Sequence, residues 1–207
     1  MNHPEIVHHT FDWKPEEFEA RKAWPIKGTT DWKGEFASQS PLNQMHVVRD
    51  GKGAEGSTGY LALRGENSDQ FYAEDAPRWH RPRKTYDLRG KGVSVFLKAV
   101  TPLKISPGYE PYIFIDDYNE ADNSYCGWYL TQPLRVGNDW AFNEAVLVND
   151  EKRWVRYSPC ARSLDTVLSN VGFIGVMYLR GKDYKGVNAT GILGIDEFKY
   201  NIPLPRK

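Results

Sequence analysis

The sequence predicts an all-β protein, an antiparallel β-sandwich of the jelly-roll type. Short β-branched and aromatic segments with a period of two recur through most of the 207 residues, separated by turns rich in Gly and Pro. The pattern shows no alternation of strands with helices and no internal repeat. A chain of this length can bury a sizeable core, so we expect one domain over residues 1–207, with residues 1–35 as an irregular N-terminal arm.

The first part of the chain predicts a short helix and two strands. Pro15 precedes a run of glutamates, and this favours one or two helical turns, because Pro fits the first turn and acids favour the positive end of the helix dipole. Residues 44–49, QMHVVR, and residues 60–64, YLALR, alternate as strands do on either side of a Gly-rich turn.

The middle of the chain predicts two hairpins. Residues 92–100 and residues 110–118 both alternate apolar positions with others, and we expect them to pair across the loop between them. Residues 140–148 and residues 153–157 predict a second hairpin, closed by an NDEK turn.

The closing stretch, residues 170–200, carries the clearest strand pattern. Val171 to Leu179 and Ile192 to Tyr200 are β-branched and aromatic runs separated by a Gly/Asn loop, and we interpret both as strands. Alternation places Asp196 on one face with Phe198. An ionised carboxylate among apolar neighbours needs an ion, an Arg or backbone N–H groups as its partner, because burying it bare costs several kcal/mol.

A family resemblance rests on this C-terminal third. The Trp-led strand 154–157 (WVRY), Pro159 with a Leu-rich connector, VGFIGV, and then GILGIDEF resemble the closing half of galactose-binding-like jelly-roll domains. Many carbohydrate-binding modules share that ending. The resemblance implies a β-sandwich of this type and an expected carbohydrate ligand.

The same resemblance implies a structural Ca²⁺ held between the N-terminal segment and the closing strand. Asp196 would be one ligand, and Asp12 and Glu19 are the N-terminal carboxylates that could complete the site, since Ca²⁺ takes oxygen ligands. The competing interpretation is that Asp196 accepts backbone N–H groups or pairs with an Arg.

Charge and hydropathy exclude several partners. Lys plus Arg equals Asp plus Glu at 27 each, so no overall field attracts nucleic acid or an anionic membrane. No apolar run is long enough for a transmembrane helix, and the N-terminus lacks the features of a secretory signal. Secretion or a periplasmic location stays open if a signal peptide has been replaced by the initiating Met; otherwise we expect the cytoplasm. The sequence does not indicate an oligomeric state.

The two cysteines, Cys126 and Cys160, could form a disulfide or be two buried thiols, and we favour free, buried thiols. Cys126 lies in a predicted strand, residues 125–130, whose Gly127 marks a bulge or a close approach of a ligand to the backbone. Neither cysteine has the spacing of a zinc or redox motif.

Aromatic residues point to carbohydrate binding. The chain has seven Trp, twelve Tyr and nine Phe, and aromatic rings stack on sugar rings. We therefore expect a non-catalytic module with aromatic and polar side chains on one sheet face. The stacking candidates are Tyr112, Trp128 and Tyr178, and the polar candidates are Lys98, Asp116 and Arg180. The alternative for Trp128 and Tyr178 is that they fill the core.

Two other classes stay open. The chain lacks the common nucleophile, metalloprotease and nucleotide-binding motifs. A lyase for acidic polysaccharides needs only a base and cations, which His80, Arg83, Tyr129 and Arg135 could supply. The basic aromatic segment 78–90 could serve such a ligand or be a solvated loop. A structural or protein-interaction sandwich is the third class.

Overall fold

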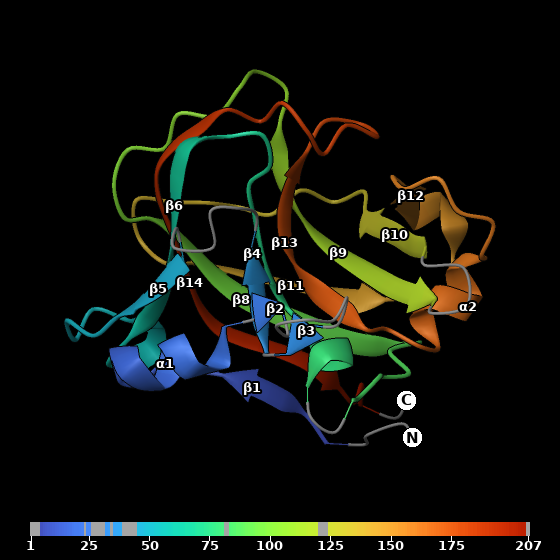
Figure 1. Ribbon diagram of the computed structural model, residues 1–207, viewed down its shortest axis with the longest axis horizontal. Helices are drawn as coiled ribbons and strands as arrows, with labels where there is room; N and C mark the ends of the chain where they lie inside the picture. Colours follow the sequence, from blue (N-terminus) through green and yellow to red (C-terminus); the bar gives the residue numbers. More distant parts are fainter. Residues whose placement is uncertain are drawn as a thin grey trace.

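The computed structural model describes residues 5–22, 24–25, 32–33, 35–38, 45–80, 83–119 and 124–205, and it shows two six-stranded sheets packed as a sandwich (Figure 1). The strands of the first sheet, in spatial order, are β11 (Ala141–Leu147), β8 (Lys91–Ala99), β14 (Ala189–Ile202), β6 (Tyr60–Ser68) and β5 (Met45–Val48), with β1 (Val7–His9) added along β14.

The second sheet has the order β12 (Trp154–Arg156), β10 (Ser124–Leu130), β9 (Glu110–Asn119), β13 (Phe173–Leu179), β7 (Tyr72–Asp75) and β4 (Phe36–Ser38). Neighbouring strands in both sheets run antiparallel. The predicted jelly-roll sandwich is confirmed.

The remaining elements are short. They are the ribbon of β2 (Trp24–Pro25) and β3 (Trp32–Lys33), the helices α1 (Pro15–Arg21) and α2 (Leu164–Leu168), and the 3₁₀ turns η2 (Ala54–Gly56), η3 (Pro77–Trp79) and η4 (Glu151–Arg153). The helix expected at Pro15 is α1. In the part of the chain that the structure describes, neither helix is long and apolar enough to cross a membrane.

Both predicted hairpins are wrong in their pairing. β8 lies in the first sheet between β11 and β14, whereas β9 lies in the second sheet between β10 and β13. β11 and β12 are likewise divided between the two sheets. Period-two alternation identifies a strand and its buried face, but it carries no information on which strand is the partner.

The core lies between the two sheets and follows the predicted alternation. On β8, Val93, Val95 and Leu97 are buried, and on β9, Ile113 and Ile115 meet them from the other sheet in the same apolar cluster. Burial of aliphatic and aromatic side chains at about 25 cal/mol per Å² is the main stabilising contribution to such a fold. The outward-pointing residues of these strands therefore do not contribute to the core between the sheets.

A β-bulge changes the alternation on β14. Glu197 has a φ of 48°, and the pairing with β8 shifts between Asp196 and Lys199. Ile195 before the bulge and Phe198 after it consequently both point into the core, so the prediction that Asp196 and Phe198 share a face is wrong.

Asp196 is fully buried and accepts hydrogen bonds from the backbone N–H groups of Ala54 (2.7 Å) and Glu197 (2.8 Å). Burial raises its pKa to about 7, although these N–H groups act in the opposite direction. The interpretation that Asp196 accepts backbone N–H groups is confirmed, and this contact holds η2 against β14.

A second buried carboxylate, Asp75 at the end of β7, joins the two sheets. It accepts hydrogen bonds from Tyr200 of β14 (2.6 Å), from His9 of β1 (2.8 Å) and from His80 after η3 (3.0 Å). Burial alone would raise the pKa of Asp75, but His9 and His80 together hold it well below its usual range. Strand β1 and the segment after η3 are thereby fixed to the core.

Cys126 and Cys160 form a disulfide, so the prediction of free thiols is wrong. Cys126 lies on β10, and Cys160 follows β12, the strand that pairs with β10. The pairing of β10 with β12 brings together two cysteines that are 34 residues apart in the sequence. Sequence separation alone could not show this proximity.

Replacing both cysteines by Ser should lower the free energy of unfolding by about 2–4 kcal/mol, because the bridge restricts the unfolded chain. Denaturant unfolding of the wild-type protein with and without reductant provides the measurement. The double variant serves as the control and should be insensitive to reductant. Equal unfolding midpoints for oxidised and reduced wild-type protein would contradict the expectation.

Asp75→Asn should lower the free energy of unfolding by about 2–4 kcal/mol, because the buried network loses its charged acceptor. Since the native pKa of Asp75 is depressed, its contribution is present above the unfolded value of about 3.9 and disappears as pH falls below it. Unfolding at neutral and at acidic pH checks both the size and the sign. The exposed Asp183→Asn is the control, and a loss in the control as large as that in Asp75→Asn would contradict the assignment.

Candidate functional site

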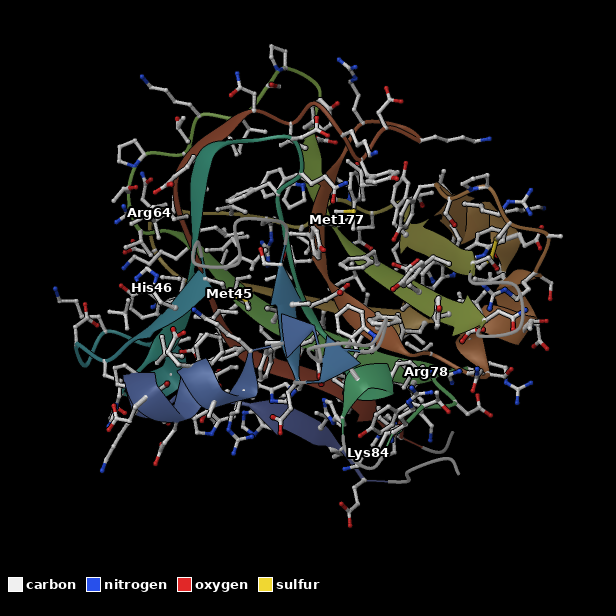
Figure 2. The ribbon with its side chains drawn as sticks, in the orientation of Figure 1. Met45, His46, Arg64, Arg78, Lys84 and Met177 are labelled. Carbon is white, nitrogen blue, oxygen red and sulfur yellow. A yellow bond between two sulfur atoms is a disulfide. The ribbon has the colours of Figure 1, made fainter. Side chains whose placement is uncertain are left out.

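The outer face of the second sheet is rich in tyrosine. Alternation on β9 sends Tyr112, Phe114 and Asp116 to this face and the intervening isoleucines to the core. Alternate residues of β10, β13 and β7 point to this same face. Met177 of β13 is one of them (Figure 2). We call this surface the tyrosine face. Its main residues are Tyr72, Tyr112, Phe114, Tyr125, Tyr129 and Met177 from strands, with Tyr157 and Tyr184 from loops.

Strand register arranges these side chains in rows across the sheet. Tyr129 of β10 opposes Phe114 of β9, Phe114 opposes Gly175 of β13, and Gly175 opposes Glu74 of β7. A Cβ at Gly175 would lie 2.1 Å from the carbonyl oxygen of Ala73, so only glycine fits there. The backbone of β7 at Ala73 and Glu74 therefore fills the space that a side chain at position 175 would occupy.

A pocket of about 250 Å³ lies on the tyrosine face. Its described lining combines aromatic rings with two carboxylates and contains no Lys, Arg or His. The residues that line it are Gln70, Tyr72, Glu74, Trp79, Asp116, Tyr125, Tyr157, Ser158, Phe173, Met177 and Tyr184.

Asp116 is held beneath one side of this pocket. The hydroxyl of Tyr157 donates to its Oδ2 at 2.6 Å. A Cβ at Gly127 would lie 2.2 Å from Asp116 Oδ1 and 2.4 Å from Tyr157 Cζ. The pairing of β10 with β9 shows no bulge at Gly127, and these two protein side chains occupy the place where a ligand was expected to approach the backbone. Burial raises the pKa of Asp116 to about 7, and Asp117 adds to the rise while Tyr157 and Arg162 oppose it.

Glu74 lies under the other side of the pocket and is only 8% exposed. No residue in the described ranges donates a hydrogen bond to its carboxylate. Burial raises the pKa of Glu74 well above its usual range, and the charges of Asp116 and Asp75 raise it further. Two carboxylates therefore lie below an aromatic pocket whose described lining contains no cation.

The predicted stacking residues divide between the two sides of the sheet. Tyr112 lies on the tyrosine face, with its ring centroid 4.8 Å from that of Tyr129. Trp128 and Tyr178 point into the core and are 6% and 4% exposed, so the expectation that they present open rings is corrected. Both faces of residues 125–130 carry aromatic rings, so the pattern could not identify the outward phase.

The predicted polar residues are also dispersed. Asp116 lies on the tyrosine face. Lys98 lies on β8 of the first sheet, with its Nζ 5.8 Å from the centre of the Trp140 ring. Arg180 follows β13 and places its guanidinium 4.9 Å from the centre of the Tyr109 ring. The expectation that these residues form one surface with the stacking aromatics is therefore corrected.

The residues that could have served as the base and cations of a lyase do not come together in one site. His80 is hydrogen-bonded to Asp75. Tyr129 packs among the rings of the tyrosine face, and Arg135 donates to a backbone carbonyl of β11. Arg83 follows on the segment after η3 and is not among the described residues that line the pocket.

The basic aromatic segment contributes one ring to the pocket. Trp79 of η3 lines it, with its ring edge-on to Phe173 at 4.9 Å. Arg78 packs over Gly172, and Lys84 lies at the same end of the molecule (Figure 2). Sequence reasoning did not select Glu74, Tyr125, Tyr157 or Tyr184 for the site. Of these residues, only Glu74 and Tyr125 lie on strands, so only for these two could the alternation of side chains have predicted the face of the sheet.

The expected calcium ligands already have protein donors. Asp12 Oδ1 accepts from Thr58 N (2.8 Å), Thr58 Oγ1 (2.7 Å) and Gly59 N (2.9 Å), and these hydrogen bonds lower the pKa of Asp12 although burial opposes them. Asp196 binds the same segment at Ala54. The two carboxylates therefore fix the loop 54–59.

Glu19 of helix α1 pairs at 2.6 Å with Lys22, the residue that follows the helix. Within the described residues, no group of three His, Cys, Asp or Glu side chains is arranged to hold a metal. The described donor set therefore does not fit the expected Ca²⁺ site. Calcium binding stays a prediction, and its measurement is melting of the wild-type protein and Asp196→Ala with Ca²⁺ and with a chelator.

Comparison with known proteins supports the fold. No protein-family model matches the sequence, and no curated protein matches it. The CBM22-1 xylan-binding domain of Paenibacillus barcinonensis Xyn10C superposes with a TM-score of 0.51 at 11% identity, covering 97% of this chain and 96% of that one.

The CBM22-1 and GH10 modules of Clostridium thermocellum endo-1,4-β-D-xylanase 10B, complexed with xylohexaose, give a TM-score of 0.50 at 11% identity. This match covers 97% of the present chain and only 28% of the xylanase chain. The fold is therefore a jelly-roll sandwich of the carbohydrate-binding-module type. Likeness at this identity establishes the fold alone.

Asp116→Asn should remove a pH dependence of stability. Because the native pKa of Asp116 is raised from 3.8 to about 7, its unfavourable effect is absent below the unfolded pKa and grows as pH rises towards the folded one. The variant should therefore gain stability relative to wild type as pH rises, on the order of 2 kcal/mol.

Chemical denaturation of both proteins at mildly acidic and mildly alkaline pH measures this gain. Asp196 titrates in the same range, but it is present in both proteins and cancels in the comparison. A difference in stability that does not change with pH would show that Asp116 titrates normally.

Proposed function

We propose that the protein is a non-catalytic carbohydrate-binding module whose tyrosine face binds a polysaccharide or oligosaccharide chain. The observation that carries the proposal is the aromatic pocket above Glu74 and Asp116. Sugar rings stack on aromatic faces, and their hydroxyls need hydrogen-bond partners at the same surface. The pocket offers both.

The rings at the pocket rim suit stacking. Tyr125 is 44% exposed, and its ring lies 4.8 Å from that of Tyr118 and 5.7 Å from that of Phe173. Across the pocket, Tyr184 packs edge-on to Tyr157 at 5.7 Å. Neighbouring rings hold each one in place, so little side-chain entropy is lost when a ligand stacks on them.

The two structural neighbours are consistent with this function. One is described as a xylan-binding domain and the other is complexed with xylohexaose. We place the present domain among the galactose-binding-like jelly rolls, on the resemblance of its closing strands. With a formal net charge of zero, we expect neither nucleic acid nor membrane as its partner.

The lyase alternative has less support. A lyase for acidic glycans needs cations near the carboxylate of the sugar, and the described lining of the pocket has none. His80, the candidate base, is occupied by Asp75. Product absorbance from unsaturated uronates, in an assay on acidic polysaccharides, would nevertheless overturn the non-catalytic assignment.

Tyr125→Ala should weaken binding of the best ligand from a glycan array by about 3- to 10-fold, because one stacking surface is lost. Isothermal titration calorimetry on folded variants gives the affinities. The matched control is Phe142→Ala, since Phe142 is 41% exposed but lies on β11 of the first sheet. Equal losses in both variants would place the site elsewhere.

Retention of no glycan at all, together with a stable oligomer in light scattering, would instead support a structural or protein-interaction domain. The same array experiment therefore separates the binding module from the third class. Glycan retention without turnover supports the module.

A further inference from the structure

We propose that the pocket of the tyrosine face selects a saccharide that carries protonated amines, a glucosamine-type polymer, and that Glu74 and Asp116 bind its ammonium groups. This inference rests on the proposed carbohydrate-binding function and names the class of ligand. It begins from the charges that line the pocket.

Strand register places both carboxylates on this one face. Asp116 on β9 opposes Phe173 of β13, and Glu74 on β7 opposes Gly175, two residues further along the same strand. Only β13 separates them, and both line the same pocket. A ligand in this pocket can therefore approach both acids.

No cation in the described lining neutralises these acids. Arg162, whose charge lowers the pKa of Asp116, is paired with Asp117, and His9 and His80 are paired with Asp75. The Lys185 Nζ lies 5.6 Å from the centre of the Tyr184 ring, and Lys185 is not a lining residue. The pocket therefore favours a positive ligand.

Both acids lack a described donor for at least part of the carboxylate. Asp116 Oδ1 is buried and has no hydrogen-bond partner among the described residues. Glu74 is more than nine-tenths buried, lines the pocket, and receives no hydrogen bond from the described residues. A buried polar group without a partner is unfavourable, and a ligand donor would remove that penalty. An ammonium group donates charge-assisted hydrogen bonds, which are about twice as strong as neutral ones.

The surrounding rings add to the preference. Tyr72, Tyr125 and Tyr157 line the same pocket, and the face of an aromatic ring attracts cations. A uronate would meet two acids and be repelled. A neutral sugar could stack and donate hydroxyls, but it would gain nothing from the charge.

Burial raises the pKa of both acids, so an ammonium ligand should displace protons from them. Asp116 from β9 and the tyrosines of the pocket lie on the same face as Glu74, and the charge of Asp75 acts on Glu74 from the opposite face of β7. Proton release on binding is therefore a signature of a cationic ligand that a neutral glycan would not give.

Three β-1,4-linked hexasaccharides test the proposal: the glucosamine hexamer, its N-acetylated form, and cellohexaose. They share a backbone and differ at C2, where they carry an ammonium, an acetamide or a hydroxyl. At mildly acidic pH, calorimetry should show the glucosamine hexamer binding at least about tenfold more tightly than the others. Repetition in buffers of different ionisation enthalpy measures the released protons.

Glu74→Gln keeps the shape of the side chain and should remove most of that advantage. Asp116→Asn provides a second variant if Glu74→Gln does not fold. Glu144→Gln is the control, because Glu144 is exposed on β11 of the other sheet. Equal affinity for the three hexamers, or an advantage that survives in Glu74→Gln, would overturn the inference.

The outcomes also separate the two proposals. If the neutral hexamers bind as tightly as the amine and Tyr125→Ala weakens them, the carbohydrate-binding function stands and the preference for amines is wrong. If none of the three hexamers and no glycan on the array binds, both proposals fail.

Discussion

The buried carboxylate of Asp75 is the interaction on which the arrangement of the sandwich depends. Its three donors come from β1, from β14 and from the segment after η3, which are far apart in the sequence. Apolar packing is tolerant of small shifts, whereas a buried charge is stable only when its hydrogen bonds are satisfied. Asp75 therefore fixes one register between elements that hydrophobic burial alone would leave loosely specified.

The neighbouring residue shows how the same strand serves both fold and site. Glu74 and Asp75 are adjacent, so they point to opposite faces of β7. Asp75 meets donors, and its pKa is lowered, whereas Glu74 meets aromatic rings and other carboxylates, and its pKa is raised. Because Asp75 points into the sandwich, its neighbour Glu74 points into the pocket outside it, where no described residue donates to its carboxylate.

The sequence was sufficient to predict where the strands lie, but it was insufficient to predict which strands pair with each other. Alternation correctly assigned the faces of β8 and β9, because burial imposes a period of two on each strand separately. It could not show that these strands lie in different sheets, that Cys126 meets Cys160, or that the bulge at Glu197 reverses the phase of β14. Each of these depends on contacts between residues far apart in the chain.

The aromatic composition illustrates the same limit at the site. Rings occupy both faces of β10, with Trp128 in the core and Tyr129 on the tyrosine face. A sandwich core and a sugar-binding face both favour large planar side chains, so aromatic content cannot distinguish them. The carboxylates do distinguish the faces. Glu74 and Asp116 line the pocket of the tyrosine face, whereas the core between the sheets is built from apolar side chains.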